Sequence, residues 1–132
     1  MRLRLAVLAL CLVLVPVAAA ALPFKAKLTA GTHTPKVNTK WPYSVRVTTL
    51  KGKPTKATIT VQIVDPTGSV HAVQFGNTTK NVTNWPVVGV FRDFVIWPPD
   101  STLANPLGGL TFRVIVKARG GRAVLRYQVR PQ

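Results

Sequence analysis

Two segments in which apolar and polar residues alternate constrain this chain more than any other feature. Residues 43–48 and 57–63 each place apolar side chains at every second position, as strands with one buried face do. Residues 51–54 (Lys-Gly-Lys-Pro) and 65–68 (Asp-Pro-Thr-Gly) have the composition of tight turns. The stretch 41–75 therefore predicts a β-meander of three strands.

The second of these turns sets an expected register for the strands on either side of it. We expect Val64 to stand opposite Ser69. Ile63 would then pair with Val70 on the inner face, and His71 would point outward.

A further hairpin is predicted at the end of the chain. Residues 110–118 alternate in polarity, Gly120 and Gly121 form a two-residue turn, and residues 123–129 alternate again. The apolar rows of both strands would share the inner face.

These patterns indicate about seven strands and an all-β fold. The strand spacing favours an antiparallel immunoglobulin-like sandwich, because turn signals recur at the interval typical of that fold. No helical period of apolar residues follows residue 22. We divide the chain into a signal peptide (1–21), a lead-in segment (22–39) with a first strand at 25–29, and the sandwich domain (40–132).

The first residues of the chain have the parts of a secretory signal peptide. Arg2 and Arg4 precede an apolar run of roughly 17 residues, and Ala19 and Ala21 fit the A-x-A cleavage pattern. We expect an N-terminal signal helix that is removed before Leu22, and a secreted or cell-surface location. If it were not cleaved, this run would be the part of the chain that contacts the membrane.

Cysteine and histidine are too scarce for a metal centre. Cys11 is the only cysteine and lies within the signal segment, so the exported chain would hold no disulfide and no thiolate ligand. His33 and His71 are the two histidines, and no third ligand clusters with them in the sequence. We therefore predict no metal and no cofactor.

Catalytic residues are equally hard to assemble from this sequence. Asp65, Ser69 and His71 have the side chains of a nucleophilic triad, but Asp65 serves the turn. Ser69 and His71 would lie roughly 6–7 Å apart along one strand, beyond hydrogen-bond reach. We predict no enzyme activity. A small hydrolase stays as an alternative that would need Asp93 buried beside His33 or His71.

The strand and turn pattern resembles a broad class of exported domains. The likeness rests on residues 43–48, 52–61 and 111–116. They resemble the immunoglobulin-like and fibronectin-type-III-like sandwich domains of bacterial exported proteins, and residues 41–73 resemble the YtkA-like domains in part. The core cysteines of true immunoglobulin domains are missing, as is a His/Met cluster for copper. The resemblance implies a binding or structural role and transfers no functional residue.

Positive charge is the sharpest functional signal. The chain has 18 Lys and Arg against 3 acids, a net charge of +15, and such a protein is drawn to polyanions. Arginines dominate the predicted outer row of the closing hairpin, and arginine binds anionic oxygens in bidentate fashion. The candidate anion-binding residues are Arg113, Lys117, Arg119, Arg122, Arg126 and Arg130.

The segment 87–97 offers a second candidate surface. Both of its alternate rows are largely apolar, so one row needs a cover. The loop 98–109 is the favoured cover, and a protein partner is the alternative. The candidate interface residues are Phe91, Phe94, Ile96 and Trp97.

The sequence therefore predicts an exported, non-catalytic binding or structural module. Its leading partner would be an anionic cell-surface polymer or lipid headgroups, contacted through the basic hairpin. The alternative is protein–protein interaction through residues 87–97. No nucleic-acid recognition module is visible, which argues against sequence-specific binding to nucleic acid.

Overall fold

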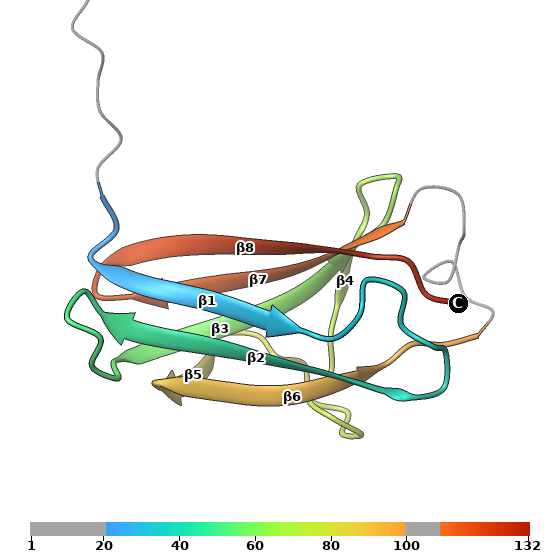
Figure 1. Cartoon of the computed structure of the whole chain (residues 1–132), viewed down its shortest axis with the longest axis horizontal. Helices are drawn as coiled ribbons and strands as arrows, with labels where there is room; N and C mark the ends of the chain where they lie inside the picture. The colour runs from blue at the N-terminus through green and yellow to red at the C-terminus, as the bar shows by residue number, and fades with distance from the viewer. Residues whose placement is uncertain (1–20, 100–108) are drawn as a thin grey trace, which may run out of the picture.

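The computed structural model describes residues 21–99 and 109–132, and the predicted signal helix and most of the predicted covering loop lie outside them. The described residues form eight strands and no helix, which confirms the all-β prediction (Figure 1). One sheet contains β1 (Phe24–Ala30), β2 (Lys40–Thr49) and β6 (Val90–Ile96). The other contains β3 (Lys56–Val64), β4 (Val70–Ala72), β5 (Trp85–Val88), β7 (Leu110–Ala118) and β8 (Gly121–Val129).

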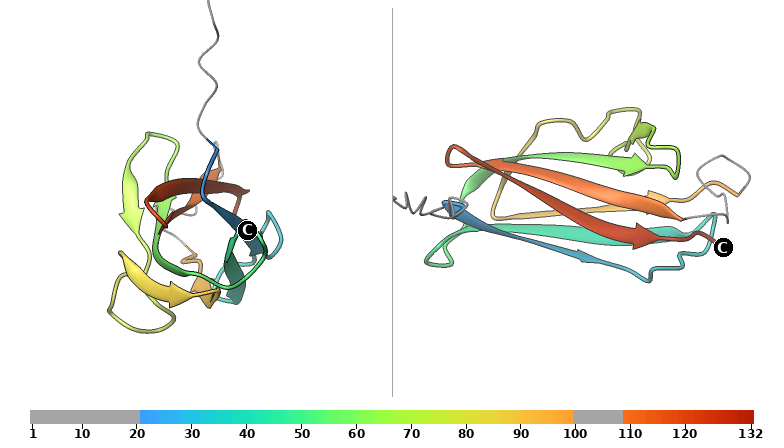
Figure 2. Two further views of the ribbon diagram at one scale, coloured as in Figure 1. Left: turned by 90° about the vertical axis from the view of Figure 1, so that its left-hand side faces the viewer. Right: turned by 90° about the horizontal axis from the view of Figure 1, so that it is seen from above.

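The two sheets are antiparallel and pack face to face (Figure 2). The smaller sheet has the order β1-β2-β6, and the larger has the order β4-β3-β7-β8. Strand β5 also pairs with β3, beside the first half of that strand, while β4 pairs with its last residues. The central strand of the larger sheet is therefore bordered by two short strands along one edge.

The core lies between the sheets and is built from the predicted alternating rows. Val45 and Val47 of β2 belong to this core, as do Ile59 and Val61 of β3, and all four side chains are buried. At one end of the core, the rings of Trp41, Tyr43, Trp97 and Phe112 pack edge to face or tilted on one another. The inner rows predicted for residues 43–47, 57–63 and 110–118 are confirmed.

Both sides of the sandwich are closed by backbone hydrogen bonds. On one side, Gly89 accepts a hydrogen bond from the Val47 N–H at 2.7 Å and donates one to the Thr55 carbonyl at 3.1 Å. On the other side, residues 33–37 pair with residues 130–132 after β8. The segment predicted as a lead-in thus contains β1 and takes part in closing the sandwich.

The predicted register of β3 and β4 is wrong by one residue. Val64 pairs with Val70 and Ile63 pairs with His71. The turn holds one more residue than expected, because Gly68 adopts a positive φ of 87°. A one-residue shift exchanges the faces of a strand, so Val70 is exposed and His71 turns inward.

The segment 87–97 is two strands and not one. Gly89, at a φ of 75°, separates β5 in the larger sheet from β6 in the smaller sheet. The closing turn also differs by one residue from the prediction. Arg119 and Gly120 form it, with φ of 49° and 77°, and Ala118 pairs with Gly121.

Candidate anion-binding face

The outer face of β7 and β8 carries two cross-strand pairs of like-charged residues. Lys117 lies opposite Arg122, and Arg113 lies opposite Arg126. Directly opposed side chains in antiparallel strands have Cβ atoms about 5 Å apart, so each pair repels itself unless solvent or an anion screens it. The two pairs are four residues apart along the strands, roughly 13 Å. This surface, with these four residues, is named the basic face.

A half-buried apolar pair separates the two charged pairs. Ile115 lies opposite Val124 on the same outer face. Thr60 of β3 completes this row across the sheet. A ligand lying along the basic face would therefore meet positive, apolar and positive patches in turn.

Arg113 is held in place by a neighbour on β3. Gln62 lies directly opposite it, and its Oε1 accepts hydrogen bonds from Arg113 Nε at 3.0 Å and Nη2 at 2.6 Å. The contact is partly buried and fixes one side of the guanidinium. A side chain held in this way loses less conformational entropy when it binds an anion.

The other two predicted anion-binding residues lie beyond the strands. Arg119 is the first residue of the β7–β8 turn, and Arg130 follows β8. The backbone N–H of Arg130 donates to the His33 carbonyl at 2.7 Å. The structure thus brings Arg113, Lys117, Arg122 and Arg126 onto one face and places Arg119 and Arg130 at opposite ends of β8.

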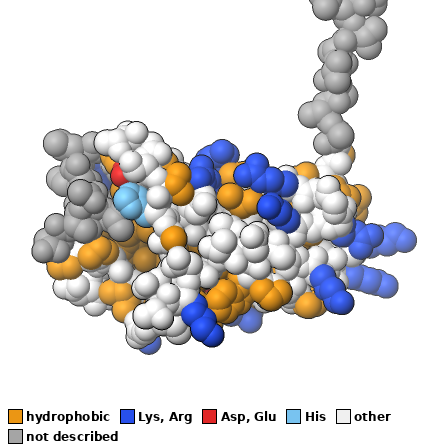
Figure 3. Space-filling view, turned by 180° about the vertical axis from the view of Figure 1, so that it is seen from behind, with side chains coloured by type: hydrophobic (Ala, Val, Ile, Leu, Met, Phe, Trp, Pro, Cys, Tyr) orange, Lys and Arg blue, Asp and Glu red, His pale blue; other side chains and the backbone are white. Residues whose placement is uncertain are grey.

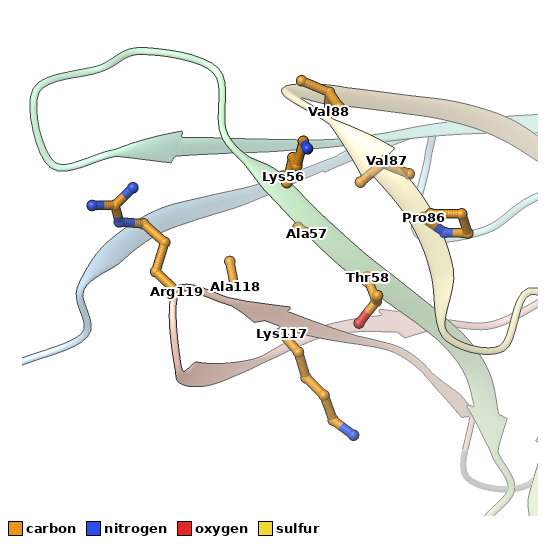
Figure 4. A pocket seen from close by; sticks show the side chains of 9 residues that line it. All are labelled: Lys56, Ala57, Thr58, Pro86, Val87, Val88, Lys117, Ala118 and Arg119. Carbon is orange, nitrogen blue, oxygen red and sulfur yellow. The ribbon is translucent and has the colours of Figure 1, made fainter.

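A hollow of about 580 Å³ borders the basic face beside the β7–β8 turn (Figure 4). Lys56, Lys117 and Arg119 contribute charge to its lining, and Pro86, Val87 and Val88 of β5 contribute an apolar wall. A smaller hollow of about 480 Å³ shares Lys117 and Arg119 and reaches Arg122. No acidic residue lines either hollow among the residues that the structure describes.

Sequence reasoning missed Lys56 and Val88 as neighbours of the hairpin. Both are exposed, and they face each other across the β3–β5 pairing. The Gly89 break that brings β5 beside β3 was the one available signal, since glycine within a strand pattern often marks a change of direction.

The two acids that the structure describes lie away from the basic face. In Figure 3, the acidic colour lies beside histidine at one end of the face seen from behind, while most of the lysine and arginine lies over the middle and the other end. Asp93 accepts hydrogen bonds from the Tyr43 hydroxyl at 3.1 Å and the Gly76 N–H at 3.0 Å. A hydroxyl and a backbone amide therefore meet the charge of this carboxylate. Burial raises the pKa of both Asp93 and Tyr43.

The side chains of Asp65 and His71 are hydrogen-bonded at the β3–β4 turn. Asp65 Oδ2 lies 2.9 Å from His71 Nε2, and Oδ1 accepts hydrogen bonds from the Thr67 and Ser69 N–H groups. The contact with His71, followed by the Thr67 hydroxyl, lowers the pKa of Asp65 to about 2. The carboxylate is therefore occupied by the turn itself.

The two histidines that a hydrolase would need beside Asp93 have other hydrogen-bond partners. His33 stacks on Tyr127 with ring centres 4.0 Å apart and lies 2.6 Å from the Gln128 carbonyl. Asp93 contacts neither His33 nor His71 through the hydrogen bonds given above. Residues 21–99 and 109–132 contain no group of three or more His, Cys, Asp or Glu side chains able to hold a metal.

The four residues predicted for a partner interface divide between the core and the surface. Phe91 and Trp97 point inward and are 5 % and 0 % exposed, so a partner could not reach them. Phe94 is half-buried, with the Lys40 ammonium 4.7 Å from its ring centre, and Ile96 is exposed. Phe94 and Ile96 also line a hollow of about 440 Å³.

The chain matches no protein-family model, and a search among curated proteins gives no match either. Within the described residues, no helix has the length and apolar character needed to cross a membrane.

Proposed function

We propose that this protein is an exported, non-enzymatic binding module that holds anionic polymers at the cell surface through its basic face. The observation that carries the proposal is the pairing of Lys117 with Arg122 and of Arg113 with Arg126 on one sheet face. Two like-charged pairs in register oppose folding slightly. A polymer with regularly spaced anions would convert that repulsion into attraction.

The strand order supports an immunoglobulin-like assignment for this module. If β1, β2 and β6 are taken as strands A, B and E, then β3, β7 and β8 correspond to C, F and G. This is the division of strands between the two sheets of immunoglobulin-type sandwiches. The basic face then lies on the outer side of strands F and G.

The chemistry of the face favours sulfate, phosphate or carboxylate groups on a flexible polymer. Arg122 and Arg126 are exposed and can offer paired N–H donors to such oxygens, while Lys117 adds a point charge. The apolar pair between the charged pairs would contact the uncharged part of each repeat. Binding of this kind weakens as salt rises, because exposed charges are screened.

Polyphosphate and heparin are suitable probes, with neutral dextran as the uncharged comparison. We expect the Arg122→Gln/Arg126→Gln variant to bind both polyanions roughly ten-fold more weakly at about 0.15 M salt. This follows if each lost contact contributes about 0.7 kcal/mol, within the range for exposed ion pairs. Fluorescence anisotropy of labelled polymer measures the affinity.

The matched control is Arg46→Gln/Arg92→Gln, which removes two exposed arginines from the outer face of the smaller sheet. The proposal requires this control to retain nearly all of the wild-type affinity. Equal losses in the two variants would show that the whole surface attracts polyanions without a site. Binding of a protein partner that survives high salt would favour the surface around Phe94 and Ile96.

A further inference from the structure

One end of the sandwich gathers four separate segments into a single surface. The start of β1, the β2–β3 turn, the β5–β6 corner and the β7–β8 turn all lie there, and the views agree (Figures 1 and 2). Gly121 is so close to the chain before β1 that an added Cβ would lie 2.8 Å from Pro23 Cδ. Gly89 lies equally close to Pro54. This surface is named the hairpin end.

Exposed aliphatic side chains concentrate at the hairpin end. Leu50 in the β2–β3 turn is 56 % exposed, and Val88 at the β5–β6 corner is 63 % exposed. Leu22 and Val90 are each 41 % exposed. These are four of the six large aliphatic residues that are exposed in the described chain. Turn residues with no packing role are normally polar, so this clustering indicates a partner that accepts apolar groups.

The same four segments also carry exposed basic side chains. The exposed basic residues of the same four segments are Lys25, Lys51, Lys53, Lys56 and Arg119. Neither acid that the structure describes belongs to these segments, since Asp65 lies in the β3–β4 turn and Asp93 within β6. The hairpin end therefore combines apolar tips with an excess of positive charge.

This combination distinguishes a bilayer from a dissolved polyanion. A polymer in water would be held at this end mainly by the lysines, because Leu50 and Val88 lie at turn tips and not in a row along a sheet face. An anionic bilayer takes both, because apolar tips enter the boundary of the acyl chains while basic side chains contact headgroup phosphates.

We propose that the hairpin end docks on an anionic lipid bilayer, with Leu50 and Val88 entering its surface and Lys51, Lys53 and Lys56 contacting phosphates. The strands run away from this end (Figure 1), so the sheets would stand on the bilayer. The basic face would remain free at the side of the molecule. This inference goes beyond the proposed function and uses different residues.

Vesicle flotation tests the docking. The protein is recovered from a secreting host, and mass spectrometry establishes its N-terminus. We expect it to float with vesicles of phosphatidylcholine containing 30 % phosphatidylglycerol at about 0.15 M salt. The Leu50→Ser/Val88→Ser variant should bind about ten-fold more weakly, because it loses two apolar side chains that enter the bilayer. The Val70→Ser/Ile96→Ser variant, which alters exposed residues at the opposite end, should bind as wild type.

A fluorophore placed at the surface supplies the second measurement. In a Cys11→Ser background, an environment-sensitive dye is attached at Leu50→Cys or at Val70→Cys. Anionic vesicles should shift the emission of the dye at position 50 to the blue and leave the dye at position 70 unchanged. This readout is made on chains whose N-terminus is residue 22, because a retained apolar run would by itself hold the start of β1 near a bilayer.

Equal emission shifts at the two positions, or no shift at position 50, would overturn the docking. So would wild-type flotation by the Leu50→Ser/Val88→Ser variant. If only the Arg122→Gln/Arg126→Gln variant lost vesicle binding, the lipid contact would lie on the basic face and not at the hairpin end. Failure of polymer binding with intact vesicle docking would instead refute the proposed function alone.

Discussion

Asp65 and Asp93 lie in opposite electrostatic surroundings. Hydrogen bonds hold the Asp65 carboxylate, whereas burial disfavours the charge of Asp93 and raises its pKa. The first group stabilises the fold when it is ionised. The second stabilises the fold less as pH rises through its raised pKa, because the folded state then holds a charge that it disfavours.

The pair of Asp65 and His71 predicts acid sensitivity at the β3–β4 turn. The pKa of Asp65 is lowered to about 2 from an ordinary value of 3.8, so its contribution is complete above the ordinary value and is lost as pH falls toward 2. We expect Asp65→Asn to reduce the loss of stability between about pH 4 and pH 2. Urea unfolding at a series of pH values measures this, and an unchanged acid limb would contradict it.

Asp93 predicts a contrast between two substitutions. Asp93→Asn keeps an oxygen acceptor for the Gly76 N–H and removes a charge that burial disfavours, so stability at pH 7 should stay equal or rise. Asp93→Ala should lower the free energy of unfolding by about 1–3 kcal/mol, because two partly buried donors lose their acceptor. Equal losses in the two variants, by urea denaturation, would show that the negative charge itself is needed.

At the scale of elements, Gly89 is the point where the chain passes from one sheet to the other. Its φ is 75°, and an added Cβ would lie 2.8 Å from Pro54 Cβ. Gly89→Ala should therefore cost about 2 kcal/mol or more of unfolding free energy. The control is Gly120→Ala, which has a similar φ of 77° but open space around it. Equal decreases of the melting temperature in the two variants would show that backbone strain alone causes the loss, with no contribution from the contact with Pro54.

The strands could be predicted from the sequence wherever one face is buried. Alternation located β2, β3, β7 and β8, because a period of two is unambiguous when an inner row packs against a second sheet. The register of β3 and β4 was missed, since a positive φ at Gly68 adds a residue to the turn. Phe91 and Trp97 were assigned to a surface because both alternate rows of residues 87–97 are largely apolar, so alternation does not show which row faces the core.

The basic face could be predicted for the same reason, since the outer row of a hairpin follows from its inner row. Arg113, Lys117, Arg122 and Arg126 share a face as expected. The hairpin end could not be predicted, because Leu50, Val88 and Arg119 come from three turns that only the tertiary fold brings to one end. Alternation carries no information about which turns of a sandwich lie together.

At the scale of the whole molecule, charge and apolar exposure are distributed unevenly. The hairpin end is basic and apolar. Of the two acids that the structure describes, Asp65 contacts His71 at the β3–β4 turn, and Asp93 accepts a hydrogen bond from the Tyr43 hydroxyl. A protein with a net charge of +15 binds many polyanions weakly. The basic face is a site only if particular arginines contribute more than their share of that attraction.

The salt dependence of polyphosphate binding tests that point most directly. The affinity of the wild type, of Arg122→Gln/Arg126→Gln and of Arg46→Gln/Arg92→Gln is measured across a salt series. We predict that the slope of log affinity against log salt falls by about 1–1.5 for the basic-face variant, since each lost contact with a single-stranded polyanion removes roughly 0.7. The slope of the other variant should match that of the wild type. Equal reductions in both variants would contradict a polymer site on the basic face.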